Sequence, residues 1–196
     1  MKIEFRPLHV NEVETRVLST YTKQDKEGKT VPHGLTLLIH KNARVDMQLL
    51  DEVVGAENWQ RDHFQAKNTL FCRIGIWDED KKQWIWKADC GEEGNASEKK
   101  SESSDSFKRA ATNWGIGREL YSAPFIWVKA EKVSWREKKD KKTGEISFTT
   151  KDEFEVRTYN VEEKKIVGLE IWNKTAKIPA FVWGKVIDFT PMEPRQ

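Results

Sequence analysis

The spacing of apolar residues predicts helices and strands in the first third of the chain. Residues 6–18 carry apolar side chains at a loose helical spacing, which predicts an N-terminal helix. A polar turn at 25–29 precedes the apolar run 35–40, which predicts a strand, although so short a run also fits a buried helix. Residues 43–55, ARVDMQLLDEVVG, predict a helix with an apolar stripe that ends at Gly55.

The clearest pattern is a β-hairpin after a preceding strand at 58–66. The segments 70–77 and 83–90 flank the polar turn DEDKK. A hairpin that is symmetric about this turn places the even-numbered residues on one apolar face, with Cys72 roughly opposite Cys90 as two reduced core thiols. The apolar face then holds Leu70, Cys72, Ile74 and Ile76 opposite Trp84, Trp86, Ala88 and Cys90, and the other face holds Arg73, Trp77, Lys87 and Asp89.

A long helix is predicted within SDSFKRAATNWGIGREL, residues 104–120. Lys108, Arg109 and Thr112 point away from its apolar side, whose small residues allow close packing on a sheet. That apolar side holds Ser104, Phe107, Ala110, Ala111, Trp114 and Arg118.

The remainder of the chain reads as β-rich. Strands are predicted at 125–135 and 145–150 around a basic turn, and a further hairpin turns at EEKK. Residues 129–151 carry eight Lys and Arg against four Asp and Glu, and residues 188–196 resemble a frayed tail. The pattern as a whole predicts an α+β fold.

Composition narrows the class of protein. The 196 residues carry a net charge of +2, so any basic surface for a polyanion has to be local. A mean hydropathy of −0.76 and the lack of a long apolar run exclude a membrane-spanning helix. The first residues show no apolar signal core, so we expect a cytoplasmic protein. The two cysteines form no CxxC and the four histidines show no ligand spacing, so no zinc site is indicated.

Sequence signatures of enzymes are largely missing. The chain has no GxxxxGK[ST] loop, and WGIGREL lacks the preceding strand and the spacing of a dinucleotide fingerprint. Acidic residues at 78–80 and 92–93 would suit a metal-dependent nuclease, but turns and loops ordinarily carry such solvated charge. We therefore expect a protein that is not an enzyme and needs no cofactor.

The adjacent pair Lys108 and Arg109 is the strongest candidate for binding chemistry. Adjacent helical residues lie about 100° apart, so both cations can reach one polyanion that runs along that flank. Backbone phosphates require charge but no base-edge geometry. For a bare Lys-Arg pair, however, a solvated helix surface is the more common outcome, and the basic loop 136–142 has the same alternative.

Two blocks give the chain a resemblance to a known family. ARVDMQLLDEVVGAENW and DSFKRAATNWGIGRELYSAPFIWV, with a three-strand meander between them, resemble the annealing core of the Rad52 family in its bacteriophage branch. The similarity covers roughly residues 35–128. It implies a β-β-β-α annealing core, ATP-independent binding and annealing of single-stranded DNA in recombination and double-strand-break repair, and assembly into a ring or arc.

The resemblance also implies which residues bind DNA. Lys108 and Arg109 match the family's Lys-Arg pair on the long helix, and Arg44 resembles its groove arginine. Eukaryotic members carry a further basic residue where this chain has Thr112. Either the groove is less basic than in those members, or other cations compensate, namely Arg61, Arg73, Lys87, Lys99 and Lys100.

The implied organisation is an annealing core with an N-terminal helix at 1–128 and a hairpin-rich extension at 129–196. The implied partners are single-stranded DNA and further copies of the chain. A third implied partner is a single-stranded-DNA-binding protein of the host or phage, or a phage exonuclease. The implied location is the cytoplasm of a bacterial host. A coating protein that protects single strands without annealing them is the main alternative, and a metal-dependent nuclease is the other.

Overall fold

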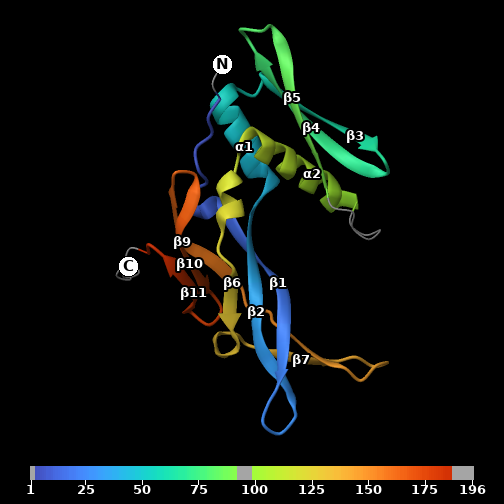
Figure 1. The fold of residues 1–196 in the computed structure, drawn as a ribbon, viewed down its shortest axis with the longest axis vertical. Helices are drawn as coiled ribbons and strands as arrows, with labels where there is room; N and C mark the ends of the chain where they lie inside the picture. Colours follow the sequence, from blue (N-terminus) through green and yellow to red (C-terminus); the bar gives the residue numbers. More distant parts are fainter. Residues whose placement is uncertain (1–2, 92–98, 187–196) are drawn as a thin grey trace, which may run out of the picture. The chain divides into compact units, whose positions relative to one another are not determined.

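The computed structural model describes residues 3–91 and 99–186, which divide into two compact units (Figure 1). The helical unit comprises Met1–Val13 and Lys41–Tyr121, and it contains both α-helices named below. The strand unit comprises Glu14–His40 and Ser122–Gln196. The fold is α+β with mostly antiparallel sheets, as the sequence predicts.

The helical unit is built from a helix, a three-stranded meander and a second helix. Asn42 caps the first helix, because its side chain accepts a hydrogen bond from the Arg44 N–H at 2.9 Å. Gly55 ends this helix with a φ of +86°, which confirms the predicted stop. The elements are α1 (Ala43–Val54), β3 (Trp59–Ala66), β4 (Thr69–Asp78), β5 (Gln83–Cys90) and α2 (Lys99–Trp114).

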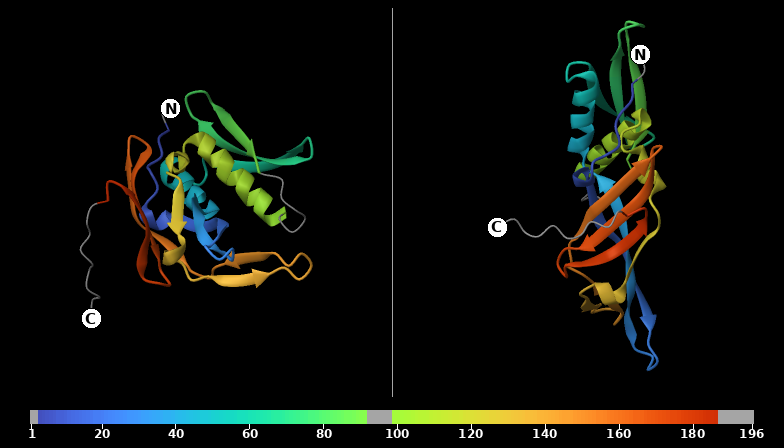
Figure 2. Two further views of the ribbon diagram at one scale, coloured as in Figure 1. Left: turned by 60° about the horizontal axis from the view of Figure 1, so that its bottom comes forward. Right: turned by 90° about the vertical axis from the view of Figure 1, so that its left-hand side faces the viewer.

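Helix α2 packs on one face of the antiparallel sheet β3-β4-β5, mainly against β4 and β5 (Figures 1 and 2). Phe107, Ala110 and Ala111 are fully buried, which confirms the core of its predicted apolar side. The prediction is wrong for Ser104, which is exposed, and for Arg118, which lies beyond the end of the helix. Small residues at 110 and 111 allow the helix to approach the sheet closely.

The predicted register of the hairpin is wrong by one residue. Cys72 pairs with Asp89, and Cys90 pairs with Phe71, so the two thiols lie on opposite faces of the sheet. Asp78 pairs with Gln83, which leaves a four-residue loop in place of the predicted five-residue turn. Because side chains alternate between faces, this change moves every β5 residue to the other face. The face packed on α2 therefore holds Ile85, Lys87 and Asp89, opposite Ile76, Ile74 and Cys72.

The predicted N-terminal helix is also wrong. Residues Val10–Glu12 form only a 3₁₀ turn, and Val13–Gln24 form strand β1. The pairing of β1 with the next strand outweighs the loose helical spacing, and Thr and Val favour the extended backbone. Arg6 fixes the segment before the strand through two hydrogen bonds of 2.8 Å to the Glu12 carboxylate.

The strand unit contains two three-stranded sheets and one two-stranded sheet. The strand predicted at 35–40 is confirmed as part of a longer strand, and the hairpin predicted around EEKK is confirmed as β9 (Phe154–Glu162) and β10 (Lys165–Asn173). A further strand, β11 (Ile178–Gly184), has no counterpart among the predicted elements. The sheets are β1-β2-β6, with β2 (Thr30–Lys41) and β6 (Ile126–Lys129), β7-β8 (Arg136–Lys139 and Ile146–Thr149), and β9-β10-β11 (Phe154–Glu162, Lys165–Asn173 and Ile178–Gly184).

The structural units are discontinuous in sequence, because residues 14–40 group with the C-terminal strands. The predicted boundary at residue 128, between an annealing core and an extension, concerns function and stays a prediction. The tail at 188–196 lies outside the described residues. None of the described helices is long and apolar enough to cross a membrane.

Candidate nucleic-acid interface

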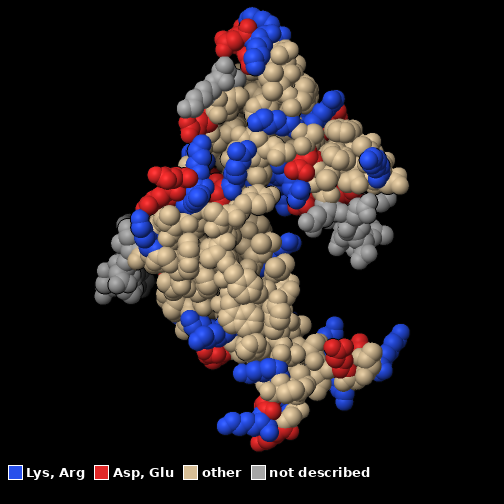
Figure 3. Space-filling view, viewed as in Figure 1, with Lys and Arg blue, Asp and Glu red and all other residues tan. Residues whose placement is uncertain are grey.

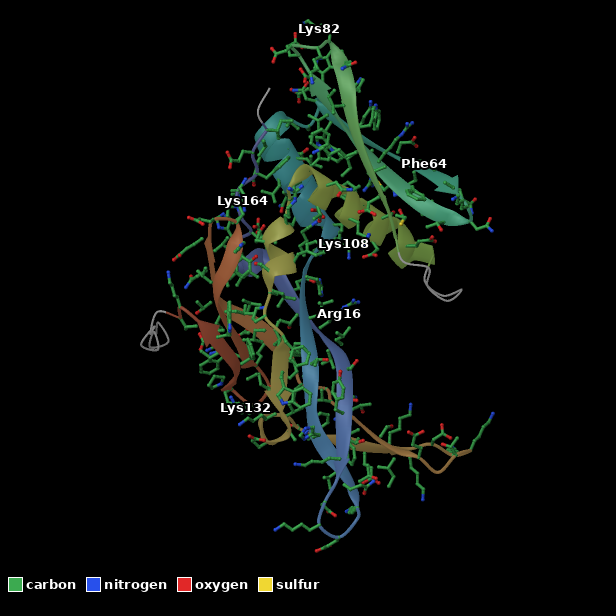
Figure 4. All side chains as sticks on the ribbon, in the orientation of Figure 1. Arg16, Phe64, Lys82, Lys108, Lys132 and Lys164 are labelled. Carbon is green, nitrogen blue, oxygen red and sulfur yellow. The ribbon has the colours of Figure 1, made fainter. Side chains whose placement is uncertain are left out.

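Lys108 and Arg109 lie near the middle of α2, and each has an acidic neighbour. Figure 4 labels Lys108 on this helix. The Lys108 Nζ is 3.3 Å from the Asp105 carboxylate one turn earlier in the helix. The Arg109 Nε is 3.3 Å from the Asp89 carboxylate of β5. Burial acts against the charge of Arg109, but Asp89 favours it through its charge and hydrogen bond, so the pKa of the guanidinium is raised. Both cations are partly exposed and therefore available to an anion.

A third cation, Lys41, lies buried under α2. Its ammonium pairs with the Asp46 carboxylate of α1 and donates a hydrogen bond to the Lys108 main-chain carbonyl at 3.2 Å. Burial raises the pKa of the Asp46 carboxyl to about 6 and lowers the pKa of the Lys41 ammonium. The pair thus fixes the backbone of α2 at the residue that carries the Lys108 side chain. No pattern in the sequence indicates this role of Lys41, because a lysine at the end of a strand resembles a solvated residue.

Lys87 and Arg61 lie at the two edges of the sheet, on the face that packs against α2. The pairing Arg61–Ile74–Lys87 places them two strands apart, roughly 10 Å. The Lys87 Nζ donates to the Asn113 carbonyl at 2.9 Å and lies 4.4 Å from the centroid of the Trp114 ring system. The Arg61 guanidinium lies 4.9 Å from the Phe107 ring centroid. Their positions place both cations beside the helix that carries Lys108.

Arg118 is a further cation at the end of α2. Its guanidinium donates hydrogen bonds to the carbonyls of Thr112 and Asn113, at 3.0 and 3.1 Å, where the last carbonyls of the helix lack intrahelical partners. Lys87 and Arg118 therefore both bind the negative end of the helix dipole. Because the sequence predicted Arg118 within the helix, on its apolar side, its hydrogen bonds to the end of the helix were not expected.

The remaining predicted cations are not gathered at one place. Arg44 is exposed in the first turn of α1, a helix that contacts α2. Arg73 lies on the opposite face of the sheet from α2 and pairs with Asp62 at 2.9 Å. Lys99 and Lys100 belong to the first turn of α2, and their side chains lie outside the described part of the structure.

The Trp-Gly-Ile-Gly run ends α2 and closes the space around Lys41. Gly115 and Gly117 both have positive φ, of +110° and +64°, and between them Ile116 is fully buried. A Cβ on Gly117 would lie 2.6 Å from the Lys41 Cε. The second glycine is therefore required both by its backbone conformation and by the buried lysine. The Trp114 indole N–H donates to the Ile74 carbonyl at 3.0 Å and ties the end of the helix to the sheet.

The acidic residues considered for nuclease chemistry form part of a turn. The Asp78 carboxylate accepts the N–H groups of Asp80 and Lys81 at 3.1 Å, and these backbone bonds, above all that from Lys81, lower its pKa. Glu79 pairs with Lys82. Residues 92–93 lie outside the described residues, and within the described ones no group of three or more His, Cys, Asp or Glu side chains could hold a metal ion.

Acidic and basic side chains are mixed over α1 and α2 (Figure 3). The candidate interface is thus not a uniformly basic patch, and Asp105 and Asp89 partly neutralise its two central cations. An arrangement of this kind can hold phosphates through Lys and Arg on a rigid helix, in competition with the carboxylates. Such binding is expected to weaken steeply with salt.

Comparison with known proteins identifies the family. The model of the Rad52/22 family double-strand break repair proteins matches residues 9–142, a range that contains β3, β4, β5 and α2. The chain therefore belongs to the Rad52/22 family, whose role is DNA double-strand break repair and recombination. No curated protein and no solved structure matches the chain.

Proposed function

We propose that the chain is an ATP-independent single-strand annealing protein of the bacteriophage branch of this family. It binds single-stranded DNA through the cations of α2 and pairs complementary strands in recombination. It acts as a homo-oligomer, a ring or an arc, without catalytic residues and without a cofactor. In this proposal the sheet β3-β4-β5 and α2 form the annealing core.

The observation that carries the proposal is the position of Lys108 and Arg109 within the range that matches the family model. They lie next to each other on α2. The backbone of this helix is held by the hydrogen bond from Lys41, and its end is held to the sheet by the hydrogen bond from Trp114. A rigid support keeps the two cations in place, so that little conformational entropy is lost when they bind phosphates.

Annealing follows physically from such an interface. Two DNA strands repel each other through their phosphates, and cations on the protein reduce that repulsion. Contacts to phosphates leave the base edges free to pair with a second strand. Neither step consumes a nucleotide, and the sequence accordingly has no phosphate-binding loop of the GxxxxGK[ST] type.

The test is annealing of two complementary labelled oligonucleotides, with and without ATP, with mass photometry on the same sample. The proposal predicts fast annealing by a large oligomer and the same rate in both conditions. Binding without any acceleration of pairing would support a protein that only coats single strands. Cleavage of the oligonucleotides in magnesium or manganese, by protein free of contaminating nuclease, would instead indicate the nuclease.

A further inference from the structure

The face of the sheet β3-β4-β5 that lies opposite α2 is lined by aromatic side chains. Directly paired residues of antiparallel strands point to the same side, and the pairs Phe64–Phe71, Gly75–Trp86 and Trp77–Trp84 all belong to this face. We call the side chains of Phe64, Phe71, Trp77, Trp84 and Trp86, with Arg73 among them, the aromatic face.

The aliphatic residues of β4 and β5 all lie on one face of the sheet. The branched aliphatic residues of β4 and β5, namely Leu70, Ile74, Ile76 and Ile85, alternate onto the face that packs on α2. The apolar side chains on the aromatic face are rings, alanine and Cys90, without any Leu, Ile or Val. Rings beside an arginine are the groups on which successive bases of a single strand stack.

Arg73 lies between the two exposed rings. Its guanidinium carbon is 4.6 Å from the centroid of the Trp86 ring system and 5.8 Å from the Phe64 ring centroid. The Asp62 carboxylate holds it at 2.9 Å. Trp86 lies directly over Gly75, where an added Cβ would come within 2.9 Å of the indole. The rings are therefore held in place.

The two outer rings remain exposed to solvent. Phe64 is 39% exposed and Trp86 is 37% exposed, although burial of an aromatic side chain is favourable. Arg73 and Asp62 cancel each other's charge, so this face offers stacking surface but little net charge. That chemistry suits bases and not phosphates.

We propose that the aromatic face binds unpaired bases of single-stranded nucleic acid, which stack on Phe64 and Trp86 on either side of Arg73. The inference rests on the proposed DNA-binding activity, but it concerns the opposite face of the sheet from α2. Because stacking releases no counterions, its contribution to affinity changes little with salt, in contrast to that of Lys108 and Arg109.

The test compares an oligothymidylate with an abasic oligonucleotide of the same length and charge, by fluorescence anisotropy with the full chain. The wild type should bind the base-bearing strand more tightly at elevated salt. Phe64→Ala with Trp86→Ala should weaken binding of that strand by about 10- to 100-fold, without changing the salt slope or the affinity for the abasic strand. Phe64→Tyr with Trp86→Phe should retain binding, because the rings remain.

The matched control is Phe125→Ala with Trp183→Ala, which removes two other exposed aromatic residues, 75% and 40% exposed, and should leave binding unchanged. An equal loss on both oligonucleotides, or no loss, would overturn the inference. The inference would also be overturned if Phe64→Ala with Trp86→Ala changed the oligomeric state in mass photometry but left the preference for bases unaltered. That result would show that the aromatic face is a contact between subunits. If the chain anneals strands but shows no preference for bases, only base binding by the aromatic face is refuted. If it prefers bases but does not anneal strands, only the proposed annealing function is refuted.

Discussion

The buried ammonium of Lys41 donates a hydrogen bond to the main-chain carbonyl of Lys108 at 3.2 Å. One lysine thus holds the backbone of the residue whose own side chain is proposed to hold DNA. The ammonium is available for this role because Asp46 supplies its counter-charge and Gly117 leaves room for its methylene groups.

Substitution of Lys41 tests how strongly Lys41 and Asp46 depend on each other for the stability of the fold. Lys41→Met leaves the Asp46 carboxylate buried without a cation, so the free energy of unfolding should fall by about 3–5 kcal/mol in urea denaturation. Lys41→Met with Asp46→Leu should recover most of that loss, because no buried charge remains. If the double variant is as unstable as the sum of the two single variants, the residues are not a coupled pair.

The raised pKa of Asp46 predicts a pH dependence of stability. Because burial raises this pKa from 3.8 to about 6, the folded chain binds more protons at Asp46 than the unfolded chain between these values. Raising the pH through this window therefore lowers the free energy of unfolding, by up to about 3 kcal/mol. The stability of the wild type relative to Asp46→Asn should decline from pH 4 to pH 6, while Glu57→Gln, an exposed control, should show no such trend. A relative stability that instead rises with pH would show that Lys41 depresses this pKa.

Alanine substitutions at Gly117 and Gly28 distinguish the cost of backbone strain from the cost of steric overlap. Both have positive φ, +64° and +75°, but an added Cβ meets Lys41 only at Gly117 and meets nothing within 4 Å at Gly28. Gly28→Ala should cost about 1 kcal/mol of unfolding free energy from strain alone. Gly117→Ala should cost about 1–3 kcal/mol more, because Lys41 has to move. Equal losses in denaturant titrations would mean that Lys41 accommodates the methyl group freely.

The acidic neighbours of Lys108 and Arg109 are expected to limit DNA affinity. Asp105→Asn with Asp89→Asn removes two charges that compete with phosphate, so single-stranded DNA should bind about 3- to 10-fold more tightly at low salt. Glu153→Gln, which removes the acidic neighbour of Lys174 in the strand unit, should change the dissociation constant little. Weaker binding by the double variant would show that the carboxylates orient the cations productively.

Local patterns in the sequence predicted much of the helical unit. The alternation of residues 70–77, the polar turn after them and the stop at Gly55 gave the correct strands and helix end, because short-range rules govern these features. The register of β4 and β5 was wrong because it depends on whether the loop holds four or five residues, and both fit the same polar stretch.

Features that depend on long-range contacts could not be predicted. Residues 13–24 are extended because β2 pairs with them, which outweighs their own weak helical spacing. Lys41 is buried with Asp46 as its counter-charge and Gly117 against its methylene groups, and Gly117 lies far from it in sequence. The sequence placed Lys108 and Arg109 on one helix, which the structure confirms, whereas the acidic neighbour of Arg109, Asp89, lies 20 residues away on β5. Their role in DNA binding stays a prediction.

The most direct test of the central claim is the salt dependence of single-stranded DNA binding by Lys108→Ala with Arg109→Ala. If α2 holds the DNA backbone, affinity should fall by about 10- to 100-fold, and the slope of log K against log salt should become less steep by about one to two, with no change in melting temperature. Lys165→Ala with Lys174→Ala removes the same charge outside the range that matches the family and should keep the wild-type slope. An unchanged slope in the Lys108 and Arg109 variant would contradict the claim that these residues bind phosphates.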